Sequence, residues 1–235
     1  MRPLRVAILG SASALLTRDD RDALFEIVDV ARHGTPPRNL ALREEYDRET
    51  AEALRDQGVD YVFLAGYPYI VTRPLLATFP DRLLALHDGD LTILDEDRQR
   101  RYRELHATRR AVFDGDTETR SSLFFATERL GAGPLLLLSA PFAIAPIARH
   151  ALDRGDYELA ADYARIHRRW MIAASWGEML AQAIRLFAAG TIAIIDGIAW
   201  VDGVPGPCRL GEAPRFCDSA AARRGIPASC PFIQS

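Results

Sequence analysis

Three short apolar segments alternate with helical segments in the first ninety residues, and this order constrains the fold more than any other feature. The apolar segments cover residues 5–9, 60–66 and 82–86. Their side chains are apolar almost throughout instead of alternating, which is typical of parallel strands covered on both faces. An amphipathic helix over residues 41–57 separates the first two, and a helix that begins at Thr72 separates the last two. The order predicts an α/β fold with a doubly wound, mostly parallel sheet.

The rest of the chain extends this pattern. We expect a helix at 19–25, a strand at 25–30, a helix at 98–114, strands at 121–126 and 135–139, a long helix at 157–189, and strands at 191–195 and 198–201. Asp196-Gly197 between the last two strands indicates a hairpin, because both residues tolerate positive φ. We predict an α/β domain over residues 1–143, a helical extension with a hairpin that completes it over 144–203, and a tail containing Pro, Gly and Cys over 204–235.

Composition narrows the class of partner. The 235 residues carry a net charge of −3, which gives no bulk attraction to nucleic acid or to an anionic membrane. No apolar run is long enough to cross a membrane, and the first residues resemble a buried strand and not a signal peptide. The three cysteines, at 208, 217 and 230, match no zinc pattern. We therefore expect a cytoplasmic protein with reduced thiols that acts on a small molecule.

Residues that follow the apolar segments are the first candidates for a functional site. In doubly wound sheets, ligands bind beyond the carboxyl ends of the strands, and Gly10, Gly66 and His87 each follow such an end. His87 could polarise a carbonyl group, and Asp88 or Asp90 could orient it or act as a base. The alternatives are a core histidine and two turn residues around a glycine. We predict no metal site, since His87, Asp88 and Asp90 would give three local ligands without a distinctive spacing.

Several segments, in order, resemble the folate-dependent formyltransferase family, with the glycinamide ribonucleotide enzymes as the nearest type. Leu-Leu-Ala-Leu-His at 83–87 resembles the family's Leu-Leu-Asn-Ile-His, and Tyr-Asp-Arg-Glu at 46–49 matches a helix motif of the family. Further similar segments are 62–67, 105–116, 121–135 and 199–203. Each segment alone is unspecific, but their order and spacing together identify the family.

The resemblance implies a formyltransferase-type α/β fold and a 10-formyltetrahydrofolate-like formyl donor. His87 would act on the formyl oxygen, with Asp88 or Asp90 as its acid-base partner. The residues implied to line the donor pocket are Tyr67, Tyr69, Val71, Leu84, Thr127, Gly131 and Gly133.

Key positions depart from the family pattern. Ala85 stands where the family has its catalytic Asn, and Gly131 stands where it has its catalytic Asp. Removing one preorganised donor costs on the order of 10²–10³ in rate, so the standard reaction should be strongly impaired. The family's phosphate-binding turn is replaced by Gly-Ser-Ala-Ser-Ala at 10–14, and Tyr69 replaces an Arg. We therefore expect an acceptor that is not a ribonucleotide.

Three kinds of function remain open from the sequence. The first is formyl transfer to an amine of a small metabolite by a noncanonical site. The second is folate-independent chemistry in the same cleft, such as acyl or carbamoyl transfer, hydrolysis or rearrangement. The third is ligand binding without catalysis. An enzyme is favoured, because a decayed site has no reason to retain a His-Asp turn at the end of a strand.

Two further clusters have simple structural interpretations. His106, beside Arg109 and Arg110, is expected to be solvated or packed on a helix. His167, Arg168, Arg169 and Trp170 on the long helix are expected to form a solvated face. Alternatively, the apolar side chains of this helix could bury the interface of a homodimer; these are Trp170, Met171, Trp176, Met179 and Leu180.

Overall fold

The computed structural model describes residues 2–10, 25–28, 37–67 and 69–211. These divide into two compact units. Unit 1 comprises Met1–His87, Leu123–Leu137 and Leu180–Cys208, and unit 2 comprises Asp88–Ser122, Leu138–Met179 and Arg209–Ser235. The domain bounds predicted at residues 143 and 203 stay a prediction. The predicted helix at 19–25 lies almost wholly outside the described residues.

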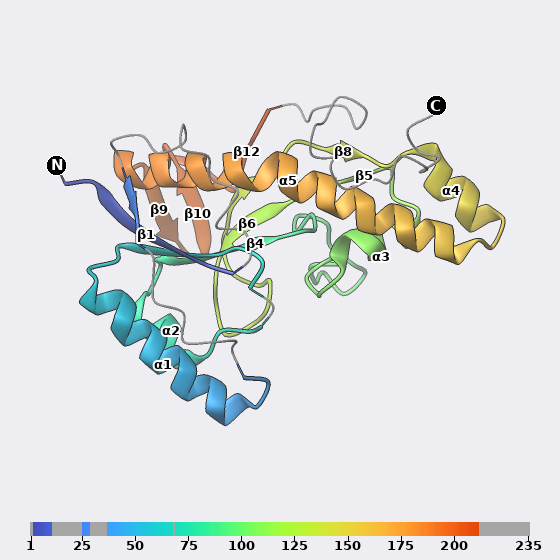
Figure 1. Cartoon of the computed structure of the whole chain (residues 1–235). Helices are drawn as coiled ribbons and strands as arrows, with labels where there is room; N and C mark the ends of the chain where they lie inside the picture. Colours follow the sequence, from blue (N-terminus) through green and yellow to red (C-terminus); the bar gives the residue numbers. More distant parts are fainter. Residues whose placement is uncertain (1, 11–24, 29–36, 68, 212–235) are drawn as a thin grey trace. The chain divides into compact units, whose positions relative to one another are not determined.

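A mostly parallel sheet forms the framework, as predicted (Figure 1). Its strands, in spatial order, are β12 (Cys208–Arg209), β7 (Leu135–Leu138), β6 (Ser122–Phe125), β4 (Leu83–His87), β3 (Tyr61–Leu64), β1 (Leu4–Leu9) and β2 (Phe25–Ile27). The pairs β1–β2, β1–β3 and β3–β4 are all parallel. The three apolar segments recognised in the sequence therefore form adjacent strands.

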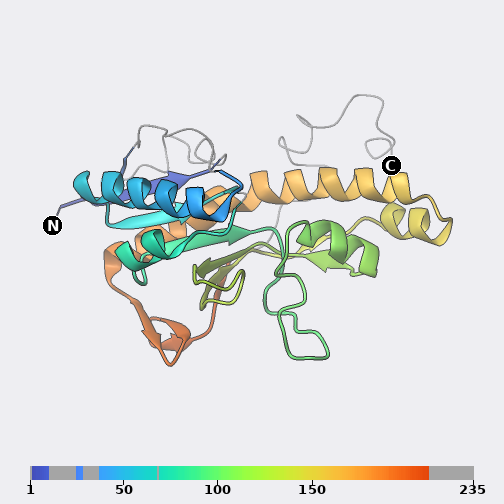
Figure 2. The same cartoon turned by 90° about the horizontal axis from the view of Figure 1, so that it is seen from below.

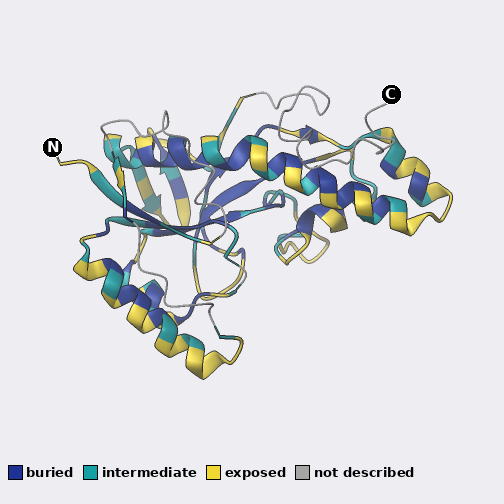
Figure 3. Cartoon of the chain, viewed as in Figure 1, coloured by how far each residue is buried: buried dark blue, intermediate teal, exposed yellow. Residues whose placement is uncertain are grey.

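Helices cover both faces of the sheet in unit 1. On one face, α1 (Leu40–Asp56) and α2 (Arg73–Thr78) pack through Leu54 and Leu75 against a core that includes Val62 and Leu83. Figure 3 shows α1 with one buried and one exposed side, as its amphipathic sequence predicts. On the other face, Phe187 of α5 (Tyr157–Ala189) stacks on Tyr61 with ring centroids 4.0 Å apart. Burial on both faces explains why the strands are continuously apolar.

The predicted hairpin near the end of unit 1 is confirmed. Strands β9 (Ile192–Ile195) and β10 (Ile198–Val201) pair antiparallel, and β11 (Val204–Pro205) adds a third strand (Figure 2). Asp196 and Gly197 have φ values of 52° and 74°. Positive φ at both central positions is the geometry of a type I′ turn, which suits the twist of paired strands.

Unit 2 differs from the prediction in its first helix. The predicted helix at 98–114 is wrong in its first half, because only α3 (Ala107–Asp114) is helical. Arg98 and His106 adopt φ values of 58° and 66°, which interrupt a right-handed helix. Three elements of unit 2 were not predicted: β5 (Glu118–Thr119), β8 (Phe142–Ala143) and α4 (Pro146–Asp153).

The long helix α5 was predicted with the correct ends, but its side chains do not lie where expected. Its large apolar residues are at most 3% exposed; these are Trp170, Met171, Trp176, Met179 and Leu180. They are buried within the chain, and the predicted homodimer stays a prediction. His167 is also fully buried, so the predicted solvated face is wrong for His167 and Trp170, whereas Arg169 is exposed and Arg168 is partly exposed. None of the described helices is both long and apolar enough to be a transmembrane span.

Candidate active site

The end of β4 presents His87 on the face of the sheet that α1 and α2 cover. Side chains alternate along a strand, so Leu83, Ala85 and His87 share one face. Leu83 and Ala85 belong to the core beneath α1 and α2, which fixes the face on which His87 lies. Ala85 and His87 are half-buried, whereas Leu83 is 1% exposed. His87 therefore places a partly accessible imidazole on this side of β4. It lies two residues after Ala85, which stands where the family has its Asn.

A buried carboxylate on α1 holds the segment that follows β3. Asp47 is fully buried, and its Oδ2 accepts hydrogen bonds from the Thr72 amide at 2.6 Å and the Thr72 hydroxyl at 2.7 Å. Its Oδ1 accepts a bond from the Tyr67 hydroxyl at 3.3 Å. Burial and the Asp47 charge raise the pKa of Tyr67, so the phenol remains a donor. Thr72 precedes the first turn of α2, and its hydroxyl bonds Asp47 and not the helix backbone.

Tyr67 and Tyr69 form a small aromatic cluster in this held segment. Their rings meet edge to face with centroids 6.4 Å apart, and the Arg43 guanidinium lies 4.6 Å from the centre of the Tyr69 ring. Both tyrosines are half-buried, and Tyr67 packs on the same core as Val71 and Ala85. The arrangement gives the α1 side of the sheet an aromatic edge on which a planar ring could lie.

The loop implied to complete the donor pocket begins at the opposite end of β4 from His87. The Ala126 amide bonds the Leu83 carbonyl at 2.8 Å, so the loop after β6 leaves the sheet where β4 starts. Gly131 is buried and has a φ of 65°, whereas Thr127 is exposed and donates to the Arg129 carbonyl at 3.0 Å. A Cβ at Gly133 would lie 1.8 Å from the Phe125 carbonyl oxygen, so the hairpin itself requires this glycine.

The predicted donor residues are therefore only partly brought together. Tyr67 and Val71 share one core cluster with Ala85 and Ala126 on the α1 side of the sheet, which fits an apolar planar ring. Leu84 is fully buried, and by alternation its side chain lies on the face of the sheet opposite to His87. The predicted phosphate-turn segment at 11–14 lies outside the described residues. Its first glycine, Gly10, sits against the Ala65 carbonyl, where a Cβ would approach to 2.3 Å.

The residue after His87 is a buried carboxylate with a guanidinium partner. The Asp88 side chain is 8% exposed, and its Oδ2 accepts a bond from Nε of Arg168 at 2.6 Å. The Thr108 hydroxyl lies 3.1 Å from the same oxygen and 2.7 Å from the Asp88 carbonyl oxygen. Arg168, predicted to lie on a solvated face, is thus a partner of a predicted site residue.

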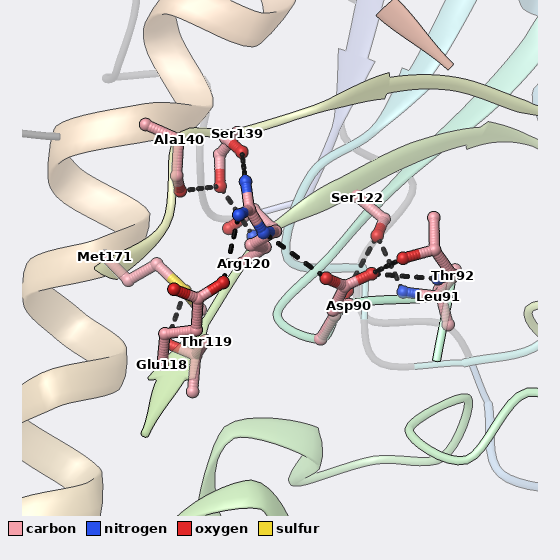
Figure 4. A network of polar contacts seen from close by, with 12 residues as sticks. Asp90, Leu91, Thr92, Glu118, Thr119, Arg120, Ser122, Ser139, Ala140 and Met171 are labelled. Atoms are coloured by element: carbon pink, nitrogen blue, oxygen red, sulfur yellow. Dashed lines mark hydrogen bonds and ion pairs between the residues drawn. The ribbon is translucent and has the colours of Figure 1, made fainter. Parts of the chain in front are cut away.

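Asp90 is held in a separate polar network (Figure 4). Its Oδ1 accepts a bond from the Thr92 amide at 2.9 Å and a short bond from the Thr92 hydroxyl, while its Oδ2 lies 3.4 Å from Nε of Arg120. Arg120 also donates to Glu118 at 2.9 Å and to the Ser139 carbonyl at 3.2 Å. Both Asp90 oxygens therefore shape the turn, and its predicted catalytic role remains a prediction.

A small cavity in unit 2 has a mostly apolar lining. Its volume is about 10 Å³, which is the space of about one water molecule. Four acidic residues are among those that line it; these are Asp88, Asp90, Asp116 and Glu118. Among the described residues, however, no group of three or more His, Cys, Asp or Glu side chains has an arrangement suited to a metal ion.

His167 belongs to a buried chain of hydrogen bonds, not to a surface. Its Nδ1 is 3.1 Å from the Tyr163 hydroxyl and its Nε2 is 2.7 Å from the Thr119 hydroxyl. The Tyr163 oxygen accepts from the Ala145 amide at 2.6 Å, and the Thr119 hydroxyl lies 3.3 Å from the sulfur of Met171. Every donor finds an acceptor when Nε2 carries the proton. Burial lowers the pKa of His167 to about 4, so the ring is neutral at pH 7.

The sequence contained a signal for His167 but none for Arg168. Tyr163, His167, Trp170 and Met171 recur at helical spacing, which places His167 on the apolar face of α5. Arg168 meets a carboxylate that is 80 residues distant in the chain. No local pattern reports such a pairing.

Comparisons with known proteins identify the family. The model of the formyl transferase family matches residues 21–154, which is more than half of the chain. Phosphoribosylglycinamide formyltransferase of Escherichia coli strain K12 is 29% identical over 174 residues, covering 74% of this chain and 71% of that protein. Methionyl-tRNA formyltransferase of Nitratidesulfovibrio vulgaris strain Hildenborough is 32% identical over 109 residues, covering 46% of this chain and 30% of that protein.

A solved structure agrees in fold. The phosphoribosylglycinamide formyltransferase of Anaplasma phagocytophilum superposes with a TM-score of 0.58 at 18% identity, covering 89% of this chain and all of that one. At this identity the likeness concerns the fold, and it agrees with the parallel sheet and flanking helices described above. The strand order, the position of His87 and the match over residues 21–154 lead to one conclusion: this chain belongs to the formyl transferase family.

Proposed function

We propose that this protein transfers a formyl group from a 10-formyltetrahydrofolate-like donor to an amine of a small metabolite that is not a ribonucleotide. The observation that carries the proposal is His87, a half-buried imidazole at the end of β4 on the same face as Ala85, Tyr67 and Val71. Family membership makes one-carbon transfer the reaction class to expect.

His87 would stabilise the oxygen on which negative charge develops. In the transfer, the amine nitrogen bonds to the formyl carbon, the bond from that carbon to N10 of the donor breaks, and one proton passes from the amine to N10. A preorganised donor such as the His87 ring hydrogen-bonds the formyl oxygen most strongly when its charge is largest. Since Ala85 has no polar side chain, position 85 supplies no amide to the formyl oxygen, and we expect slower chemistry than in relatives with an Asn there.

The α1 side of the sheet would hold the planar part of the donor. Tyr67 and Val71 offer apolar surface, and Tyr69 adds an aromatic ring beside Arg43. Leu84 and Gly133 would act indirectly, because Leu84 is fully buried and Gly133 is in close contact with the Phe125 carbonyl.

Hydrolysis of a formyl donor is a second candidate. A water molecule in place of the amine would attack the formyl carbon beside His87, the bond from that carbon to N10 of the donor would break, N10 would take up a proton, and formate would be released. The scaffold is common to both candidates, and they differ only in the nucleophile.

One assay separates the two candidates and tests the proposal. The purified full chain is incubated with 10-formyltetrahydrofolate labelled with ¹³C in the formyl group and with a mixture of small amines, and products are identified by mass spectrometry. We expect labelled N-formyl amines. Labelled formate alone would favour hydrolysis, and an unconsumed donor that does not bind in calorimetry would contradict both.

A further inference from the structure

A larger cavity lies entirely within unit 1, away from His87. Its volume is about 200 Å³. The residues that line it come from the start of β3, the turn before β4, the end of β6, the end of α5 and strand β9; they include Tyr61, Asp81, Phe125, Phe187, Ile192 and Ile194. Because β3 and β4 are parallel, both begin at this end of the sheet. His87 ends β4 about 13 Å farther along the strand, on the face that α1 and α2 cover.

The walls of this cavity are side chains that hold one another in place. The Phe187 ring stacks on Tyr61 with centroids 4.0 Å apart, and Phe125 meets it edge to face at 6.2 Å. Ile192 and Ile194 lie two residues apart on β9, so their side chains share one face. Both isoleucines, Tyr61 and Phe187 are only half-buried, which leaves apolar and aromatic surface uncovered by the described chain. An apolar cavity of about 150 Å³ holds one benzene molecule, so this cavity has room for a single ring.

A carboxylate without an internal partner borders the same cavity. Asp81 is exposed and adopts a φ of 55°, a left-handed conformation that Asp tolerates better than most residues. Among the residues that the structure describes, no group hydrogen-bonds or pairs with its side chain. The neighbouring Arg82 donates to the Thr78 carbonyl at 3.3 Å, and Asp60 at the same end of the sheet is bound by Arg2 at 2.6 Å and 3.0 Å. The charge of Asp81 is therefore available to a cation that enters the cavity.

We propose that this cavity binds a small aromatic amine, that is, a single ring with an ammonium group on a short aliphatic chain. The ring packs against Phe125, Phe187 and the two isoleucines of β9, where it buries apolar surface. The ammonium group pairs with Asp81 and lies near the Tyr61 ring, since carboxylates and aromatic faces both attract cations. None of these residues takes part in the proposed formyl transfer, so the failure of one proposal leaves the other intact.

The test follows the isoleucine methyl groups of the full chain by NMR, with ¹³C in the δ1 methyls. The first probe is 2-phenylethylamine, and each further probe changes one property: 2-phenylethanol has no charge, phenylacetate is an anion and butylamine has no ring. We expect 2-phenylethylamine to shift the Ile192 and Ile194 signals in a saturable way, with a Kd on the order of 1 mM or lower for a ligand of this size. Ile195 is exposed and lies on the other face of β9, so its signal is the internal control.

Two substitutions test the carboxylate and the cavity separately. Asp81→Asn keeps a residue that tolerates the left-handed conformation and removes the charge, so it should weaken binding of 2-phenylethylamine about three- to fivefold and leave that of 2-phenylethanol unchanged. Asp196→Asn is the matched control, because Asp196 is also exposed, has a φ of 52° and does not line the cavity. Ile194→Phe fills the cavity and should abolish binding, whereas Ile195→Phe on the other face of β9 should retain it.

The contrary results are equally specific. Equal binding of 2-phenylethanol and 2-phenylethylamine, or an unchanged Kd in Asp81→Asn, would overturn the role of the carboxylate and with it the proposed class of ligand. Equal binding of butylamine would overturn the role of the aromatic walls. A folded chain whose Ile192 and Ile194 signals do not shift with millimolar 2-phenylethylamine would overturn the site itself.

Discussion

Two buried aspartates, one in each unit, show how differently the same side chain is used. Asp47 in unit 1 is fully buried, and its partners among the described residues are neutral donors: the amide and hydroxyl of Thr72 and the hydroxyl of Tyr67. Asp88 in unit 2 is nearly as buried, but its closest partner is Arg168, whose side chain is 42% exposed. The carboxylate of Asp47 holds the Tyr67–Thr72 segment against α1. That of Asp88 orients the Arg168 guanidinium, which is partly exposed to solvent.

The contrast distinguishes a structural site from a candidate functional one. A carboxylate whose oxygens accept only internal donors stabilises the fold and offers nothing to a ligand. A carboxylate that orients a partly exposed guanidinium leaves that group available for recognition. We therefore expect substitutions of Asp47 to act on stability and substitutions around Asp88 to act on activity.

Loss of the Asp47 carboxylate should have the largest effect on stability. Asp47→Ala leaves the Thr72 amide and hydroxyl without their buried acceptor, which should lower the free energy of unfolding by about 4 kcal/mol. Urea denaturation checks this value. Glu49→Ala on the exposed side of the same helix is the control and should change stability by less than about 0.5 kcal/mol. Equal effects of the two substitutions would show that Asp47 does not stabilise the fold in the way described.

The buried His167 predicts a pH-dependent loss of stability in unit 2. Its pKa is about 4 in the folded protein because burial disfavours the charged ring, against an ordinary value of 6.5. The unfolded chain therefore binds the proton more readily, so stability is complete above pH 6.5, falls as the pH drops to about 4, and is then constant with respect to this group. The loss should be about 3 kcal/mol. Urea unfolding between pH 7 and 4 should show this slope, which His167→Gln should remove and exposed His150→Gln should retain.

Restoring the family's Asn should raise activity if His87 works as proposed. Ala85→Asn would place an amide two residues before His87 on the same face of β4. A second donor to the formyl oxygen should increase kcat roughly tenfold, a gain of about 1.4 kcal/mol in transition-state stabilisation. Steady-state kinetics with the labelled donor measures it. A fall in kcat without a loss of stability would indicate that the site performs a different reaction.

The smallest expected change in stability concerns Asp88. Asp88→Asn retains acceptors for Thr108 and Arg168 but removes the charge, and the partly exposed Arg168 can then be hydrated. The free energy of unfolding should fall by only about 1 kcal/mol, because the amide still accepts both hydrogen bonds and the Arg168 side chain is 42% exposed. Activity on amines should fall at least tenfold. A large loss of stability with unchanged activity per folded molecule would make Asp88 equivalent to Asp47.

The framework of unit 1 could be predicted because its signals are local. Continuous apolar runs gave β1, β3 and β4, and periodicity with a stop at Gly58 or Gly190 gave α1 and α5. The helix expected at 98–114 failed because the left-handed residues Arg98 and His106 have no distinctive sequence pattern. Short elements such as β5 and β8 depend on pairing with each other across the chain, which no window of sequence reports.

The candidate site was only partly predictable for the same reason. The end of β4 placed His87, and the resemblance named residues around it. Alternation along β4 explains why Leu84 lies on the face opposite to His87. The pairing register explains why the loop after β6 starts beside the beginning of β4. The partnership of Asp88 with Arg168 follows only from the folded chain.

The most direct test of the central claim is formyl transfer under single-turnover conditions by the wild-type chain and by His87→Ala, with His106→Ala as control. Transfer of label from 10-formyltetrahydrofolate to an amine should slow on the order of 10²–10³-fold in His87→Ala, because a donor to the developing oxyanion is lost. The exposed His106 should be replaceable without effect. Equal rates in the wild type and in His87→Ala, with both proteins folded, would contradict the account.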